Sequence, residues 1–314
     1  MKYSIVVPVY NEYKNLTPLF REIKNEMNKL NISNWEILFI NDGSTDKSLL
    51  EMQQIKDENI VIINLKKNYG QAIALDAGFQ NATGDIIISM DADLQNDPKD
   101  ISRLLKEFTS KNLDVVCGWR KSRKDPLLIK VFTIVGYYLR FLILHQNIHD
   151  AGCTLRIYKK EIIQDLELWG EMHRYIVPIL IWKGAKVREI PVNHRARKFG
   201  VSKYNWTKVA RGLVDLMFIW FWKKFSNRPL HLFGIIGITI FLLSSIPFMW
   251  SVYLKFFLGT SLSDSAWLLL SFFMATIGIQ LFTFGIIIDL QIKTYFNTSR
   301  EKKYLIEEII KNKE

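Results

Sequence analysis

The sequence has few cysteines and no cysteine motif. Cys117 and Cys153 are the only two among 314 residues, and neither belongs to a Cys-x-x-Cys spacing or lies near a histidine cluster. A disulfide framework and a zinc site are therefore disfavoured. This cysteine usage fits a reducing, cytosolic environment for the larger part of the chain.

The N-terminus lacks the long apolar run of a signal peptide, and the basic charge is not accompanied by a nucleic-acid-binding motif. The run Ile5-Val6-Val7 is too short for a signal peptide and predicts a first strand instead. The formal net charge is +11, and residues 121–228 alone hold 21 Lys or Arg against 8 Asp or Glu. This basic belt adjoins a hydrophobic segment, so it favours anionic lipid headgroups or a phosphorylated substrate over nucleic acid.

Long hydrophobic runs are absent from the first hundred residues, where short apolar runs alternate with amphipathic segments. Such alternation predicts an α/β fold with a doubly wound, mostly parallel sheet. The predicted strands are Ser4–Val9, Glu36–Ile40, Ile60–Asn64, Gly84–Met90 and Val115–Cys117. The predicted helices include one from Leu16, Gly70–Asn81 and Pro98–Phe108, the last with Asp97 as its N-cap.

Polar clusters follow three of these strands: Tyr10-Asn11-Glu12, Asn41-Asp42-Gly43-Ser44 and Asp91-Ala92-Asp93. Open α/β sheets bind ligands at the carboxyl ends of their strands, so the three clusters together predict a nucleotide site. Two carboxylates with the Gln95 amide nearby suit Mg²⁺ or Mn²⁺ shared with substrate phosphates. Taken alone, the aspartate pair could equally be a solvated loop, because Asp is common in loops.

These blocks resemble the signature of glycosyltransferase family 2, the inverting enzymes with a GT-A fold. More narrowly, the chain is similar to the polyprenyl-phosphate glycosyltransferases, among them dolichyl-phosphate mannose synthases, bactoprenol glucosyltransferases and undecaprenyl-phosphate formamido-arabinose transferases. The branch-specific blocks are Asn68-Tyr69-Gly70-Gln71, Asp150-Ala151-Gly152-Cys153-Thr154-Leu155-Arg156 and Arg197-Lys198-Phe199-Gly200-Val201-Ser202-Lys203-Tyr204. The resemblance covers essentially the whole chain.

The resemblance implies sugar transfer from a nucleotide diphosphate sugar to a lipid phosphate, with inversion of the anomeric centre. It implies Asp91, Asp93 and Gln95 as metal ligands, Asp93 and Gln95 being the firmest, while Asp91 contacts metal or ribose. The implied nucleotide-sugar site consists of Pro8, Tyr10, Glu12, Asp42, Asp91, Ala92, Asp93, Arg197 and Lys203, the last two on a basic lid over the diphosphate.

For the acceptor phosphate, the resemblance implies Arg120, with Lys130 and Thr133 at positions where relatives often have Arg and Ser. Asp150 either orients the acceptor or acts as a base. The implied catalytic residues are therefore Asp93, Asp150 and Arg120. A phosphate monoester is largely dianionic at neutral pH, because its second pKa is about 6, so the reaction needs no strong general base.

Two apolar segments, His231–Leu254 and Ala266–Ile288, are long enough to span a bilayer. Basic residues flank the pair, so the positive-inside rule predicts that both termini are cytoplasmic. The expected location is the cell inner membrane, with two spans. Pro126–His145 and Trp206–Phe225 have the aromatic and basic pattern of interfacial helices, or of ordinary core helices. The expected organisation is a cytosolic catalytic domain at 1–205, a juxtamembrane helix at 206–228, a membrane hairpin at 229–290 and a cytosolic, helical tail at 291–314.

The resemblance leaves several functions in competition. A UDP-sugar donor is preferred, and a GDP-mannose-dependent dolichyl-phosphate mannose synthase is the main alternative. A polysaccharide synthase is disfavoured because the sequence has no Gln-x-x-Arg-Trp motif and too few spans for a polymer channel. An inactive membrane scaffold is disfavoured because the aspartate blocks are all present. By resemblance, the chain is expected to form a homo-oligomer such as a tetramer.

Overall fold

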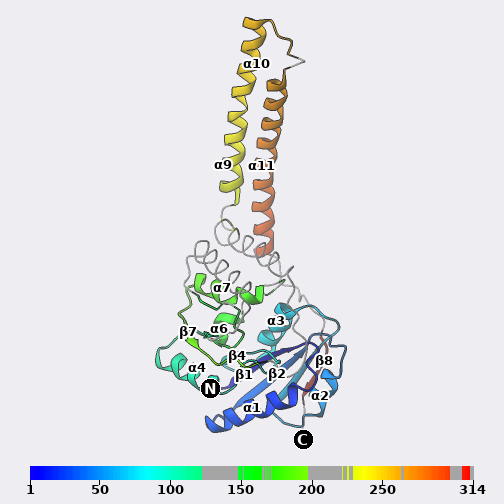
Figure 1. Cartoon of the computed structure of the whole chain (residues 1–314), viewed down its shortest axis with the longest axis vertical. Coiled ribbons are helices and arrows are strands. Elements are labelled where there is room, and N and C mark those ends of the chain that lie inside the picture. Colours follow the sequence, from blue (N-terminus) through cyan, green and yellow to red (C-terminus); the bar gives the residue numbers. More distant parts are fainter. Residues whose placement is uncertain are drawn as a thin grey trace. The chain divides into compact units, whose positions relative to one another are not determined.

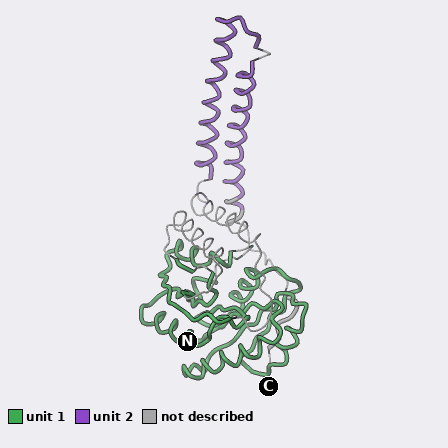
Figure 2. The backbone as a smooth tube through the Cα atoms, in the orientation of Figure 1, with its two compact units in different colours: residues 1–215, 302–314 green, residues 216–301 purple. Residues whose placement is uncertain are grey.

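The computed structural model describes residues 1–121, 148–150, 152–164, 166, 168, 170, 172–196, 221, 225, 229–262, 265–297 and 306–311. The chain divides into two compact units, one of residues 1–215 with 302–314 and one of residues 216–301 (Figure 2). Except for Phe221 and Phe225, the two predicted interfacial helices lie outside the described residues.

The first unit is built on a mixed sheet, which has eight strands in the described residues (Figure 1). The strand order is β7-β5-β6-β4-β1-β2-β3-β8, and β6 and β8 run antiparallel to the other six. Their bounds are β1 Tyr3–Val9, β2 Trp35–Asn41, β3 Ile60–Leu65, β4 Ile86–Ser89, β5 Val115–Trp119, β6 Arg156–Lys159, β7 Val187–Pro191 and β8 Ile306–Lys311. The five predicted strands are confirmed within a few residues; β6, β7 and β8 were not predicted.

Helices cover both faces of this sheet, which makes a three-layer α/β fold. Their bounds are α1 Leu16–Lys29, α2 Ser48–Gln54, α3 Gln71–Asn81, α4 Asp100–Ser110, α6 Lys160–Ile163 and α7 Ile176–Trp182, with a short 3-10 helix at Met172–Arg174. Alternate residues of each strand enter opposite cores. Ile5 and Val7 pack with α1 and α4 residues, whereas Val6 packs with residues of α3 and α7. Each such buried aliphatic side chain stabilises the fold by about 1.5–3 kcal/mol, and burial on both faces explains the apolar strands.

Helix α4 begins later than predicted. Asp97 is not its N-cap: the helix begins at Asp100, with Lys99 in the cap position and no side-chain cap bond. The Asp97 carboxylate instead accepts the Lys99 N–H at 3.1 Å and pairs with Arg195. The Asp97 carboxylate therefore joins the residue in the cap position of α4 to Arg195.

The C-terminal tail is a strand where a helix was expected. Helix α11 (Ala266–Asn297) ends early in the tail, and β8 then pairs antiparallel with β3, Ile62 opposite Ile310. The open N–H and C=O groups on the outer edge of β3 bond this segment as a strand, and such pairing overrides local helix propensity.

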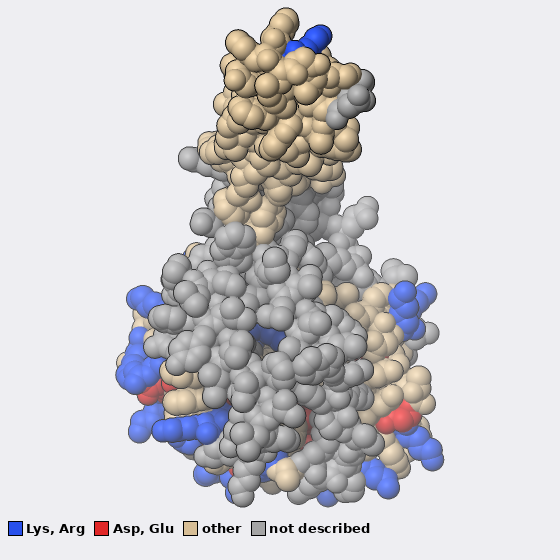
Figure 3. Space-filling view, turned by 45° about the horizontal axis from the view of Figure 1, so that its top comes forward, with Lys and Arg blue, Asp and Glu red and all other residues tan. Residues whose placement is uncertain are grey.

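The second unit contains an apolar helical hairpin. Helices α9 (Pro229–Leu243) and α10 (Ser245–Leu258) follow each other closely, and α11 returns beside α9. Two stretches, Pro229–Leu258 and Ala266–Gln291, are long and apolar enough to cross a membrane. Figure 3 shows this unit almost free of charged side chains among its described residues, with basic atoms only at its tip. Gly237 and Gly278 allow the close approach, since a Cβ on either would lie 2.6–2.7 Å from the other's carbonyl oxygen.

Candidate active site

The predicted polar clusters meet at one edge of the sheet. Strands β1, β2, β4, β5 and β7 all point the same way, so the residues that follow them lie at their shared carboxyl edge. Strand β6 runs the opposite way and contributes the residues that precede it, including Thr154. Strand β3 is parallel to β2, so the loop after it also lies at this edge, and the carboxyl edge combines segments from seven parts of the chain.

The loops after β1 and β2 are hydrogen-bonded to each other through Asn11. Its N–H donates to the Ser44 hydroxyl at 3.0 Å, and its side-chain oxygen accepts the Thr45 N–H at 2.8 Å. Asn11 has a φ of 56°, a left-handed conformation that Asn adopts more readily than most residues. The Glu12 N–H donates to the Ser48 hydroxyl at 2.9 Å. These bonds fix the backbone that carries Tyr10 and Glu12.

Asp42 fixes the loop after β3 by hydrogen bonds. Its two carboxylate oxygens accept the backbone N–H groups of Tyr69 and Gly70 at 2.7 and 2.9 Å. Burial raises the pKa of Asp42, an effect that outweighs these two hydrogen bonds. Gly43 is required beside it, because its φ is +62° and a Cβ would lie 2.4 Å from the Lys67 carbonyl carbon.

Asp91 and Asp93 form a pair of like charges after β4. Asp93 is only 7% exposed, and its carboxylate accepts the Gln95 N–H at 3.1 Å. Asp91 accepts a hydrogen bond from the Gln71 side chain at 2.8 Å. Burial, and next the negative charge of Asp93, raise the pKa of Asp91 to about 6. Leu94 has a φ of 61°, which turns the chain sharply between the aspartates and Gln95.

This pair fits a divalent cation. Two carboxylates held close together in a poorly solvated place repel each other, and a hard cation with oxygen ligands relieves that repulsion. In the described part of the chain, no three His, Cys, Asp or Glu side chains gather as a metal cage. The donor set therefore suits a cation that is also held by substrate phosphates, as Mg²⁺ and Mn²⁺ commonly are.

Arg120 follows β5 and forms a bidentate ion pair with Asp150. Its Nε–H and one terminal N–H donate to the two Asp150 oxygens at 2.7 and 2.8 Å, and its backbone N–H donates at 3.1 Å. The hydrogen bond and charge of Asp150 outweigh burial and raise the pKa of Arg120. The charge of Arg120 offsets part of the rise in the pKa of Asp91, so these two residues interact electrostatically. Gly152 leaves room for the guanidinium, since a Cβ there would lie 3.0 Å from it.

Comparison with known proteins identifies the family. Residues 4–167, more than half of the chain, match the description of glycosyl transferase family 2. The chain belongs to this family. It is 33% identical over 315 residues to a dodecaprenyl-phosphate galacturonate synthase of Rhizobium johnstonii, covering 98% of this chain and 93% of the relative. It is 31% identical to an undecaprenyl-phosphate 4-deoxy-4-formamido-L-arabinose transferase of Salmonella choleraesuis, covering 98% and 94%. These relatives confirm the polyprenyl-phosphate branch that the sequence blocks predicted.

Solved structures confirm the fold of this family 2 glycosyltransferase. Mannosyl-3-phosphoglycerate synthase from Rubrobacter xylanophilus aligns with a TM-score of 0.57 at 12% identity, covering 70% of this chain and 74% of that one. Glucosyl-3-phosphoglycerate synthase from Mycobacterium tuberculosis, in complex with Mn²⁺, UDP and glucosyl-3-phosphoglycerate, aligns with a TM-score of 0.55 at 12% identity, covering 71% and 79%.

The predicted site residues of the glycosyltransferase fall into two groups. The structure places Pro8, Tyr10, Glu12, Asp42, Asp91, Ala92, Asp93, Gln95, Arg120 and Asp150 at or just beyond the carboxyl edge. Arg197, Lys203, Lys130 and Thr133 lie outside the described residues.

Sequence reasoning missed several residues that support this site. Glu189 on β7 accepts the N–H groups of His149 and Asp150 at 2.8 and 3.0 Å, and it thereby holds the loop that presents Asp150. His149 in turn stacks on Trp119, with ring centroids 4.5 Å apart. A lone Glu in an unrecognised strand gives no local signal. Gln71, in contrast, lies within a branch-specific block and could have been found there.

Proposed function

We propose that this glycosyltransferase moves a sugar from a UDP-sugar to a polyprenyl phosphate at the cytosolic face of the inner membrane. The observation that carries the proposal is that the Asp91–Asp93 pair after β4 and Arg120 after β5 lie at the same edge of the sheet. A donor with a diphosphate leaving group needs a cation site, and an attacking phosphate needs a fixed cationic side chain beside it. The carboxyl edge offers both.

On the donor side, Asp91, Asp93 and Gln95 would hold Mg²⁺ or Mn²⁺. A bound cation would supply charge neutralisation for the leaving nucleoside diphosphate. Glu12 and Asp42 would shape the nucleoside pocket together with Pro8, Tyr10 and Ala92. Because the backbone N–H groups of Tyr69 and Gly70 already bond both Asp42 oxygens, Asp42 contributes mainly by fixing the pocket wall. Arg197 and Lys203 stay predictions for the diphosphate.

On the acceptor side, Arg120 would bind the lipid phosphate and aim one of its oxygens at the anomeric carbon. That oxygen forms the new bond as the bond to the diphosphate breaks, so the configuration inverts. A guanidinium has five N–H donors, and Asp150 uses two of them. The same geometry favours a positioning role for Asp150 over a base, because its oxygens also accept the N–H groups of Arg120 and Gly152. Lys130 and Thr133 stay predictions here.

The backbone pairing of β8 supports a location with both termini on the cytosolic side. Strand β8 follows the second candidate span in sequence and yet belongs to the same sheet as the site. A chain that crosses the membrane twice returns to its starting side, as this pairing requires. The predicted division into a catalytic domain, juxtamembrane helix, membrane hairpin and tail stays a proposal, with residues 302–314 of the tail now part of the catalytic domain. The expected homo-oligomer also stays a prediction.

The test is a matrix of donors and acceptors with the purified full-length chain in detergent. UDP-galacturonate, a UDP-linked formamido-arabinose, UDP-glucose and GDP-mannose are each incubated with undecaprenyl or dolichyl phosphate and Mn²⁺ or Mg²⁺, and transfer is scored by lipid mass. We expect transfer from a UDP-sugar to undecaprenyl phosphate, abolished by chelation. Transfer only from GDP-mannose to dolichyl phosphate would support the mannose synthase, and no transfer would support the scaffold.

Variants separate the site from the fold in this assay. Asp93→Asn should lower transfer by about 10²–10³-fold, because it removes charge from the cation site. Asp85→Asn is the matched control, since Asp85 bonds the Lys2 N–H at the opposite edge of the sheet. If Asp93→Asn transfers as well as the wild type, the proposed function is wrong.

A further inference from the structure

The loop that carries the aspartate pair, residues 91–97, is bonded at its far end to the segment after β7. The Arg195 N–H donates to the Gln95 carbonyl at 2.9 Å, and Asn96 forms an isolated β-bridge with His194. The Asn96 side chain also donates to the Thr154 hydroxyl at 3.0 Å. We call residues 91–97 the metal loop, since Asp91, Asp93 and Gln95 belong to it.

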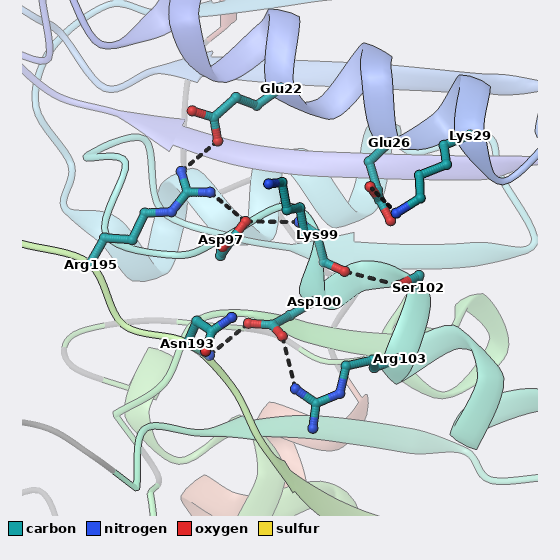
Figure 4. A network of polar contacts seen from close by, with 10 residues as sticks. All are labelled: Glu22, Glu26, Lys29, Asp97, Lys99, Asp100, Ser102, Arg103, Asn193 and Arg195. Atoms are coloured by element: carbon teal, nitrogen blue, oxygen red, sulfur yellow. Dashed lines mark hydrogen bonds and ion pairs between the residues drawn. The ribbon is translucent and has the colours of Figure 1, made fainter.

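The Arg195 side chain bridges two carboxylates from different elements (Figure 4). One terminal nitrogen donates to Glu22 on α1 at 2.6 Å, and the other donates to Asp97 at 2.5 Å. The Asp97 side chain is 11% exposed and also accepts the Lys99 N–H. Arg195 thus joins the end of the metal loop to α1 and, through its own backbone, to the chain that leaves β7.

Neighbouring bonds make this joint stiff. The Asn193 N–H donates to the Asp100 carboxylate at 2.7 Å, and Asp100 is the first residue of α4. The other oxygen of Asp100 accepts from Arg103 at 3.2 Å. In Figure 4 Asp97 and Asp100 both point toward the segment that carries Asn193 and Arg195. A loop held in this way loses less conformational freedom when it binds a ligand.

We propose that Arg195 is a positioning residue that keeps the metal loop in its cation-binding conformation through Asp97. The inference rests on the proposed function for the identity of the loop's ligand, but nothing so far assigns Arg195 a role. Arg195 does not provide a ligand; it acts on Gln95 and Asp97 by direct bonds. The Asp97 bond is the one that matters for the cation, whereas the Glu22 bond anchors the same guanidinium to α1.

This arrangement contains its own control. Asp97→Asn and Glu22→Gln each remove one carboxylate charge from Arg195 and keep the side-chain shape. Only Asp97 belongs to the metal loop. Removing a residue that orients a metal ligand directly lowers metal affinity by about 10–100-fold. Asp97 orients the ligands only through the backbone of the metal loop, so its removal should have a smaller effect. We therefore expect Asp97→Asn to weaken Mn²⁺ binding about fivefold, and Glu22→Gln to change it less than about twofold.

The experiment measures Mn²⁺ binding to the full-length chain with UDP present, by calorimetry or by the spin resonance of free Mn²⁺. Arg195→Lys, which keeps the charge but cannot bridge two carboxylates, should resemble Asp97→Asn. The Arg195→Lys, Asp97→Asn double variant should be no worse than the weaker-binding single variant. In the transfer assay, the Mn²⁺ concentration for half-maximal rate should rise in step, while the KM for polyprenyl phosphate stays within about twofold.

Two results would overturn the inference. One is unchanged Mn²⁺ binding by Asp97→Asn; the other is an equal loss in Asp97→Asn and Glu22→Gln, which would indicate general anchoring. Thermal unfolding of each metal-free variant identifies a loss caused by misfolding, and Arg195→Lys then decides the question. A wild type that binds Mn²⁺ and UDP but transfers no sugar would contradict the proposed function and leave the positioning role measurable.

Discussion

Carboxylates at the two edges of the sheet have opposite surroundings. At the amino edge, burial would raise the pKa of Glu36, but hydrogen bonds from Ser4, Thr83 and Lys2 outweigh it and lower the pKa. Burial is likewise outweighed at Asp57 by Lys24 and Asn59, and the pKa falls. At the carboxyl edge, burial raises the pKa of Asp42 and, with the charge of Asp93, that of Asp91. Hydrogen bonds and charges therefore outweigh burial at Glu36 and Asp57 of the amino edge, whereas burial prevails at Asp42 and Asp91 of the carboxyl edge.

The difference separates residues that stabilise from residues that act. Carboxylates whose pKa is raised, so that the neutral form is favoured, are common at functional sites, because a bound cation can stabilise their charge. Carboxylates with ample donors stabilise the fold. Substitutions at the two edges should therefore change stability in opposite directions.

Among the variants that test both activity and stability at the two edges, the largest effect is expected for Asp91→Asn. Transfer should fall about 10²-fold because the cation site loses a charge. The metal-free protein should become more stable by about 1 kcal/mol, because two neighbouring like charges no longer repel each other. Asparagine can still accept the Gln71 hydrogen bond, so the shape of the loop is kept. The measurements are the mass-based transfer assay and the thermal unfolding of chelated protein.

A decrease in stability on Asp91→Asn would contradict the comparison, because it would mean that the ionised carboxylate is already compensated. Asp85→Asn is again the control, since its carboxylate lies at the amino edge and accepts the Lys2 N–H. That variant should keep its transfer rate and lose a little stability.

The second largest effect is expected for Glu36→Gln, which should lower stability and leave transfer unchanged. One Glu36 oxygen accepts the Ser4 hydroxyl at 2.6 Å and the Thr83 N–H at 2.7 Å, and the other pairs with Lys2 at 3.1 Å. A glutamine presents an amide N–H₂ in place of one oxygen, so we expect a loss of about 1–3 kcal/mol in the free energy of unfolding. The transfer rate of the folded fraction should not change.

The pH dependence of this loss has a definite sign. Because the pKa of Glu36 is lowered on folding, its ionised form adds stability above the ordinary value of 4.5, and that stability disappears as the pH falls through the folded-state pKa. The difference between the wild type and Glu36→Gln should therefore be full at pH 7 and shrink below pH 4.5. A gap that widens in acid would contradict the sign. Glu58→Gln, at an exposed residue, controls for the loss of one surface charge.

The fold could be predicted from the sequence where local pattern and tertiary role agree. The strands β1 to β5 were found because burial on both faces demands short apolar runs bounded by turns. Strand β8 was not found, since its segment reads as a polar helix and becomes a strand only against β3. Asp97 was assigned to a helix cap from the local sequence alone, which could not show its partner Arg195, 98 residues away. Both errors come from contacts that no local window contains.

The site residues that belong to short sequence motifs could be predicted from the sequence. Asp91, Asp93 and Arg120 follow strands directly, and the common direction of those strands brings them to one edge. Supporting residues are dispersed: Glu189 and Arg195 act on the site from β7 and the segment after it. Their importance depends on where β7 enters the sheet, beside β5, and neither residue type nor spacing carries that information.

The smallest predicted effect is a change in the labelling rate of Cys117 and Cys153, which lie just beneath the carboxyl edge. Burial raises the pKa of Cys117 to about 12 and that of Cys153 to about 11, so both thiols stay protonated at pH 8. Since the thiolate is the reactive form, alkylation should be at least about 100-fold slower than for a free thiol.

If the carboxyl edge opens locally in the absence of a ligand, Mn²⁺ with UDP should slow the labelling of Cys153 further in the wild type. Glu36→Gln should instead speed the labelling of both thiols equally, because it acts through global unfolding. Equal labelling with and without Mn²⁺ and UDP would mean that the two edges differ in charge alone and do not differ in local opening.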